Sequence, residues 1–136
     1  MKTNIIEHKM VFNCNAETLY WILMNENLHS EVMGAEAKIE NFVGGKFSVF
    51  DGYAHGETIG LIKYKIIIQN WQFDEDGWPE AHFSVCCFEL VEINDQTTLH
   101  FIHKGVPMHL IDSLTKGWEN YYWSPINNYL KEREKN

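Results

Sequence analysis

The sequence has few cysteines, few basic residues and no long hydrophobic run. Its 136 residues include 3 cysteines, and 11 Lys and Arg stand against 19 Asp and Glu. Three cysteines, of which Cys86 and Cys87 are adjacent, do not form a disulfide framework, so we expect a reducing compartment and a cytoplasmic location. No apolar stretch approaches the roughly 20 residues of a membrane span. The N-terminal Met-Lys-Thr-Asn does not read as a signal peptide.

The shortage of basic residues also restricts the partners. A formal net charge of −8 argues against nucleic acid and against an anionic membrane surface, because binding phosphate requires Lys and Arg. An acidic domain is better suited to a basic patch on another protein. Aromatic residues make up 14% of the chain, which indicates a packed core, and the length fits one domain over residues 1–136. We expect a monomer.

No residue pattern points to a metal, a cofactor or a catalytic centre. His100 and His103 are three apart on a predicted strand and therefore point to opposite faces, as do Cys86 and Cys87. The sequence has no His-Glu-x-x-His and no Cys-x-x-Cys. Cys14 precedes a predicted helix, where a thiolate is favoured, but a small half-buried residue is the commoner explanation. We therefore expect no metal, no cofactor and no enzymatic activity.

The C-terminal stretch carries the strongest periodic pattern. Its apolar residues recur in steps of three and four: Leu110, Ile111, Leu114, Trp118, Tyr121, Tyr122, Ile126, Tyr129 and Leu130. This spacing predicts one long amphipathic helix that starts at Val106-Pro107. Gly117 is interpreted as a close approach of the helix backbone to a sheet. Pro125 predicts a kink or break between Tyr121 and Ile126.

Upstream of this helix, turn residues and hydrophobic alternation predict a sheet. The predicted strands are Ile5 to Phe12, Ala37 to Phe42, Lys46 to Phe50, Tyr53 to Leu61, Lys63 to Phe73, His82 to Ile93 and Thr97 to His103. Asn15 is a predicted N-cap for a short helix, and a second short helix follows between Asn25 and Gly34, with the break near Asn27. The order predicts an α+β fold, in which the long helix covers one face of an antiparallel meander.

Several motifs resemble a known family over about Ile5 to Leu130. They are Gly44-Gly45-Lys46-Phe47, Asp51-Gly52, Gly56-Glu57, Trp71 with Phe73, Trp78-Pro79-Glu80 with His82-Phe83, and Gly105, Pro107, Gly117-Trp118 and Tyr121-Tyr122. The sequence is similar to the C-terminal domain of the activator of Hsp90 ATPase family, and Trp-Pro-Glu-x-His-Phe is the most specific block. The resemblance implies a START-like, helix-grip fold with about six to seven strands. It also implies a stress-response co-chaperone that binds Hsp90 and stimulates its ATPase. Full-length family members carry an N-terminal domain that makes the main chaperone contact.

Two candidate sites follow from these residues. Trp78, Pro79 and Glu80 lie in a predicted loop and are candidates for a partner surface, with the alternative that Trp78 folds back over the sheet. Helix-grip domains often enclose an apolar pocket, whose expected lining is Trp71, Phe83, Val85, Phe101, Trp118 and Tyr122. The alternative, which we favour, is that these side chains fill the space themselves. The two expected functions are accordingly a co-chaperone and a binder of a small apolar ligand.

Overall fold

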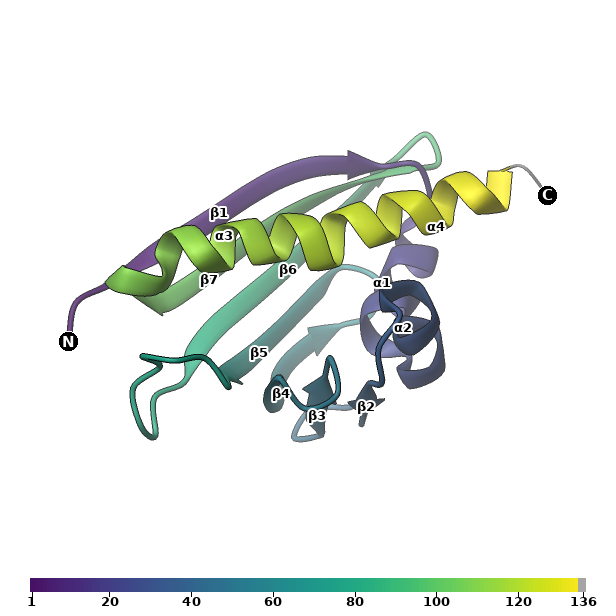
Figure 1. Cartoon of the computed structure of the whole chain (residues 1–136). Coiled ribbons are helices and arrows are strands. Elements are labelled where there is room, and N and C mark those ends of the chain that lie inside the picture. The colour runs from purple at the N-terminus through teal and green to yellow at the C-terminus, as the bar shows by residue number, and fades with distance from the viewer. Residues whose placement is uncertain (135–136) are drawn as a thin grey trace.

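The computed structural model describes residues 1–134 as a curved antiparallel sheet with a long C-terminal helix across one face (Figure 1). The elements are β1 (Thr3–Phe12), α1 (Ala16–Met24), α2 (Glu26–Met33), β2 (Lys38–Ile39), β3 (Lys46–Val49), β4 (Ala54–Ile62), β5 (Ile66–Phe73), β6 (Ser84–Ile93), β7 (Gln96–Pro107), a 3₁₀ turn (Met108–Leu110), α3 (Ile111–Trp118), a π-helical turn (Glu119–Trp123) and α4 (Ser124–Glu134). The sheet has seven strands in the order β1-β7-β6-β5-β4-β3-β2. The predicted α+β helix-grip fold is confirmed.

The two short helices form because asparagine side chains cap their first turns. The Asn15 side chain accepts a hydrogen bond from the Thr18 amide at 2.8 Å, and the Asn25 side chain accepts one from the Leu28 amide at 2.9 Å. Asn25 thus ends α1 and begins α2, two residues before the predicted break at Asn27. Gly34 ends α2 in the left-handed conformation. In Figure 1 the pair lies at one end of the sheet, beneath α4.

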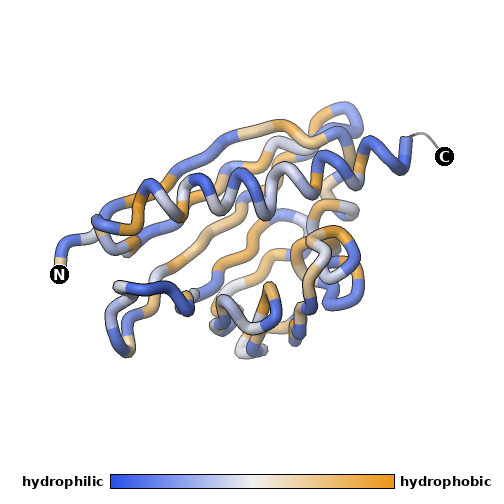
Figure 2. Tube along the Cα trace, in the orientation of Figure 1, coloured by the Kyte–Doolittle hydropathy of each residue, from blue (hydrophilic) through white to orange (hydrophobic). Residues whose placement is uncertain are grey.

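Alternation along the strands separates a buried face from an outer face. On β5 the side chains of Ile67, Gln69, Trp71 and Phe73 are buried under the helix, and on β7 those of Leu99, Phe101 and His103 are. The hydropathy trace in Figure 2 shows the same mixture of apolar and polar positions on the strands and the long helix. Apolar side chains therefore fill much of the space between helix and sheet.

The long helix starts later than predicted and is irregular near the place where Pro125 predicted a kink or break. The predicted start at Val106-Pro107 is wrong, because both residues belong to β7, where Pro107 lies opposite Thr3 of β1. On its other side β7 pairs with β6 only as far as Lys104, so the missing N–H of Pro107 costs no ladder bond there. Before Pro125 the helix does not break; a π-helical turn, Glu119–Trp123, absorbs the proline instead.

Strand lengths differ from the predictions at the sheet edge. β2 covers only Lys38–Ile39, whereas the alternation predicted a strand from Ala37 to Phe42. Phe42 is exposed and precedes the turn at Gly44 and Gly45, so its side chain adds nothing to the core. A bulge between Thr58 and Gly60 interrupts the pairing of β4 with β5 next to a glycine. Within residues 1–134, no helix has both the length and the apolar character needed to cross a membrane.

Candidate functional site

A buried hydrogen-bond chain fixes Trp118 of α3 against the sheet. The Trp118 indole N–H donates to His103 Nδ1 at 3.1 Å, and His103 Nε2 lies 2.7 Å from Ser84 Oγ. Because an indole only donates, His103 carries its proton on Nε2 and donates it to Ser84. The Ser84 hydroxyl then donates to the Trp71 carbonyl at 3.2 Å. Burial lowers the pKa of His103 to about 3, so the imidazole is neutral and the chain is complete.

A second indole–imidazole pair holds the next part of the helix. The Trp123 N–H donates to His8 Nδ1 of β1 at 2.8 Å, and the Trp118 and Trp123 rings stack with centroids 5.7 Å apart. The helix is therefore fixed to β1 and β7 by two directional bonds in addition to apolar contact. The sequence analysis missed both pairs. The feature of the sequence that could have indicated them is a histidine at an inward position of each strand, His8 on β1 and His103 on β7.

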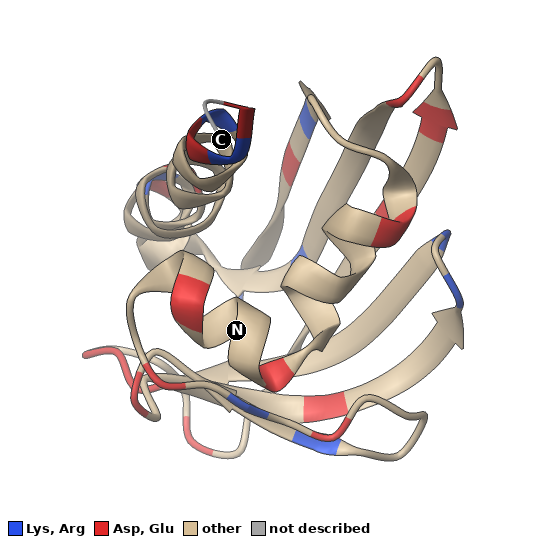
Figure 3. Ribbon diagram, turned by 90° about the vertical axis from the view of Figure 1, so that its right-hand side faces the viewer, with Lys and Arg blue, Asp and Glu red and all other residues tan. Residues whose placement is uncertain are grey.

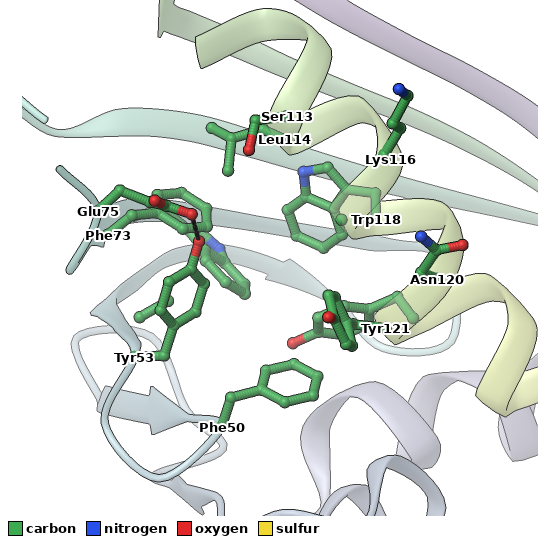
Figure 4. Close-up of a pocket in the computed structure, with 14 residues that line it drawn as sticks. Phe50, Tyr53, Phe73, Glu75, Ser113, Leu114, Lys116, Trp118, Asn120 and Tyr121 are labelled. Carbon is green, nitrogen blue, oxygen red and sulfur yellow. Dashed lines mark hydrogen bonds between the residues drawn. The ribbon is translucent and has the colours of Figure 1, made fainter. Parts of the chain in front are cut away.

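Next to these contacts, a cavity of about 550 Å³ lies between the helix and the strands β4 and β5 (Figure 4). The sheet side is lined by Phe50, Tyr53, Ala54, Trp71, Phe73 and Glu75. The helix side is lined by Ser113, Leu114, Lys116, Gly117, Trp118, Asn120, Tyr121 and Tyr122. Most of these side chains are aromatic or aliphatic, so the cavity is apolar with a few polar groups, as small-molecule sites are.

The β3–β4 turn brings Phe50 and Tyr53 to the cavity. Phe50 and Asp51 have positive φ angles of 53° and 57°, and Gly52 follows at 90°. Asp51 anchors the turn, because its amide donates to the Glu36 carbonyl at 3.0 Å and its carboxylate accepts from the Glu36 amide at 3.0 Å. The Asp51-Gly52 motif thus forms a turn that is part of the site as well as of the fold.

Polar groups line the cavity from both the sheet and the helix, and Ser113 is one of those on the helix. On one side the Tyr53 hydroxyl donates to the Glu75 carboxylate at 2.5 Å. Burial and this carboxylate raise the pKa of Tyr53, so the hydroxyl keeps its proton at neutral pH. In Figure 4, Lys116 and Asn120 of the helix lie on the other side, with the aromatic rings between.

Tyr122 separates this cavity from the buried His29 of α2. The Tyr122 hydroxyl lies 2.9 Å from His29 Nε2. Burial lowers the pKa of His29 to about 4 and raises that of Tyr122, so both groups are neutral. Within the part of the chain that the structure describes, His29 Nδ1 has no hydrogen-bond partner.

With this geometry in place, the comparisons with known proteins identify the family. The family model described as "Activator of Hsp90 ATPase homolog 1-like protein" matches residues 13–131 of the chain. The chain belongs to the activator of Hsp90 ATPase family. The human "Activator of 90 kDa heat shock protein ATPase homolog 1" is 31% identical over 118 residues, which cover 87% of this chain and 34% of the human protein. The chain therefore spans about a third of the length of that relative.

Solved structures share the fold of this activator-family chain. An HSP90 activator from Plasmodium falciparum superposes with a TM-score of 0.86 at 23% identity, covering 93% of this chain and 96% of the solved one. CalU16 from Micromonospora echinospora gives a TM-score of 0.80 at 18% identity, covering 94% and 74%. At these identities the likeness establishes the helix-grip architecture.

The structure brings together half of the lining residues predicted for this activator-family domain. Trp71, Trp118 and Tyr122 line the cavity. Phe101 is buried behind Trp118, with ring centroids 4.4 Å apart, and does not line it. The prediction that Phe83 and Val85 line the cavity was wrong. Phe83 is 46% exposed. Val85 lies on the outer face of β6, because the inward positions of that strand start at Ser84.

In the predicted partner loop, the tryptophan is not an exposed anchor for a partner. Trp78 is half-buried, its ring packs on Phe73 with centroids 5.1 Å apart, and its N–H donates to the His82 carbonyl at 2.8 Å. This is the alternative in which Trp78 folds back over the sheet. Pro79 is half-buried beside it, and Glu80 is exposed.

The predicted close approach at Gly117 is also wrong. A Cβ atom built on Gly117 meets no atom within 4 Å beyond its chain neighbours and the backbone of its own helix, because the residue faces the open cavity. Gly117→Ala is therefore expected to raise the free energy of unfolding by up to about 1 kcal/mol, the helix-propensity difference between the two residues. Urea unfolding measures this change. A loss of stability would contradict the open space at this position.

The remaining candidates for chemistry are structural. Burial raises the pKa of Cys14 to about 11, which opposes a thiolate at neutral pH and agrees with the structural explanation. Cys86 is fully buried and Cys87 points to the other face, as predicted. Within residues 1–134, no three His, Cys, Asp or Glu side chains are grouped so as to hold a metal ion.

Proposed function

We propose that this chain is a non-enzymatic co-chaperone module that binds Hsp90 in the cytoplasm and stimulates its ATPase. The observation that carries the proposal is the family match over residues 13–131, together with 31% identity to a human protein named for this activity. Because the chain spans 34% of that relative, both binding and stimulation need a test on this chain by itself.

An activator without a catalytic group of its own must act on a conformational equilibrium. It can favour the ATP-hydrolysing state of the chaperone only by binding that state more tightly than the others. Coupling of this kind typically amounts to about 5- to 150-fold in affinity. The binding contact must therefore depend on the nucleotide state of Hsp90.

Calorimetric titration of full-length Hsp90 from the same organism tests this dependence. We expect the chain to bind at least about 5-fold more tightly when Hsp90 is held with a non-hydrolysable ATP analogue than when it is nucleotide-free. Equal affinities in the two states would exclude activation by state selection, and the absence of binding in both would exclude the partnership.

The loop between β5 and β6 remains our candidate for the contact. Asp74, Asp76 and Glu80 are exposed there, while the acidic residues elsewhere are distributed over several elements (Figure 3). An acidic loop suits a basic patch on the chaperone. In the same titration Glu80→Lys should weaken binding, and more strongly at low salt. Glu31→Lys on α2 is the matched control, since Glu31 is exposed and the charge change is the same. Equal effects of both variants would remove the loop from the contact.

A second function is favoured by the cavity. Its volume of about 550 Å³ lies within the range of about 300–1,000 Å³ that small-molecule sites occupy. The rings around Trp118 pack against one another, and the open volume beside them supports the ligand alternative over the filled one that the sequence favoured. We infer that the cavity binds a small, largely apolar ligand, either as a second activity or as a regulator of the chaperone contact.

A further inference from the structure

We propose that the ligand of this cavity is a planar aromatic molecule that carries a protonated amine, and that the amine binds against the hydrogen-bonded pair of Tyr53 and Glu75. The proposal rests on the inferred ligand-binding function of the cavity. It names the chemical class that the polar groups and rings of the cavity select.

The Tyr53–Glu75 pair can only accept hydrogen bonds from a ligand. A tyrosine hydroxyl has one proton, and Tyr53 donates that proton to Glu75 at 2.5 Å. The oxygen of Tyr53 is left with lone pairs, and the Glu75 carboxylate is an acceptor by nature. A ligand group placed against the pair must therefore be a donor. A protonated amine is favoured over a neutral donor, because hydrogen bonds between charged partners are about twice as strong as neutral ones.

The backbone holds this pair in place before any ligand arrives. The Asp74 amide donates to the Tyr53 carbonyl at 2.7 Å, which joins the start of β4 to the end of β5. The Tyr53 ring also packs on Phe73, with centroids 5.8 Å apart. The acceptor pair is thus fixed by two neighbouring strands. A fixed pair lowers the cost of ordering the site on binding.

The rings beside the pair suit a flat cationic molecule. Phe50 and Tyr121 stand with centroids 6.2 Å apart on one side of the cavity, and Trp71 and Phe73 are stacked at 5.5 Å on another. Aromatic faces attract a cation within about 6 Å of the ring centroid and stack with planar rings. The cavity volume of about 550 Å³ leaves room for a planar ring beside these side chains.

The opposite side of the cavity gives the ligand a direction. Lys116 and Asn120 are exposed, and in Figure 4 the Lys116 side chain points away from the cavity. Among the described residues that line the cavity, none of those on the helix is acidic, whereas Glu75 stands on the sheet side. The amine of the ligand therefore faces Glu75.

Three probes that share one ring system test the class: naphthylethylamine, naphthylethanol and naphthylacetate. Calorimetry with the full chain is expected to give an affinity for the amine about 10-fold or more above that for the acetate, with the alcohol between them. Glu75→Gln should lower the affinity for the amine about 10-fold and leave that for the alcohol nearly unchanged. Tyr53→Phe, which keeps the ring wall but removes one acceptor, should weaken amine binding by a smaller factor.

Gly117→Leu separates the cavity from nonspecific attraction of a cation to an acidic protein. The leucine side chain enters the cavity, so all three probes should lose binding while the variant stays folded. Amine binding that survives Gly117→Leu would overturn the proposed site.

The outcomes also separate this proposal from the functions on which it depends. Binding of the acetate as tightly as the amine would overturn the ligand class and leave a ligand cavity. Failure of all three probes to bind would overturn both the class and the ligand-binding function. Loss of Hsp90 affinity in Gly117→Leu, with no probe bound by the unchanged chain, would assign the cavity to the chaperone contact and overturn the small-molecule proposal.

Discussion

Trp118→Ala is expected to lower the free energy of unfolding by about 3–5 kcal/mol. Trp118 is buried against Phe101, Trp71 and Tyr122, with ring centroids 4.4, 5.1 and 4.8 Å away. The substitution removes these contacts, enlarges the existing cavity and leaves His103 Nδ1 without its donor. The loss is a large part of a typical total stability of about 5–15 kcal/mol.

Urea unfolding of three variants separates the contributions. Trp118→Phe keeps an aromatic ring but no N–H, so it should show an intermediate loss that includes the broken bond to His103. Tyr121→Ala is the control on the same helix, because Tyr121 is 63% exposed, and its cost should stay below about 1 kcal/mol. A cost for Trp118→Ala as small as that of Tyr121→Ala would contradict the role of Trp118 in joining helix and sheet.

Mild acid is expected to destabilise the protein through two buried histidines. Burial lowers the pKa of His103 to about 3 and that of His29 to about 4, from an ordinary value of 6.5. In acid the unfolded chain therefore binds protons that the folded chain does not. The free energy of unfolding keeps its full value above about pH 6.5 and falls as the pH drops toward the folded pKa values. Between pH 7 and pH 5 each histidine should remove about 2 kcal/mol, or about 4 kcal/mol together.

Urea unfolding at pH 7, 6 and 5 measures this loss. His103→Leu removes one of the two groups, so it should reduce the pH-dependent part by about half, whatever its effect at pH 7. His55→Gln is the control for the loss of a histidine as such, because His55 is exposed on β4. A stability that does not change between pH 7 and pH 5 would contradict the burial of these two imidazoles in their neutral form.

The sequence was sufficient for the architecture because periodicity reports which side of an element is buried. The apolar steps from Leu110 to Leu130 predicted the long helix, and the turn residues predicted the strands of the meander. Asn15 was predicted as a cap because an asparagine at this position accepts from an amide in the first turn, here that of Thr18, three residues away. Signals of this kind are local, and the structure confirmed them apart from the ends of several elements.

The site could be predicted only in part, because its parts are far apart in the chain. Periodicity separated the two faces of β6 but did not say which one meets the helix, so Phe83 and Val85 were placed in the pocket. No local signal joins Trp118 to His103 or Tyr53 to Glu75. Gly117 was interpreted as a site of close packing against the sheet. The structure shows instead an open space beside it, and the sequence does not distinguish these two reasons for a glycine.

The proposed activity is tested most directly by the steady-state ATPase rate of Hsp90 from the same organism, titrated with this chain. We expect the rate to rise and to saturate at the concentration range over which calorimetry detects binding, with Glu80→Lys displaced to higher concentration and Glu31→Lys unchanged. An ATPase rate that stays at its basal value when Hsp90 is saturated with the chain would contradict the activator function.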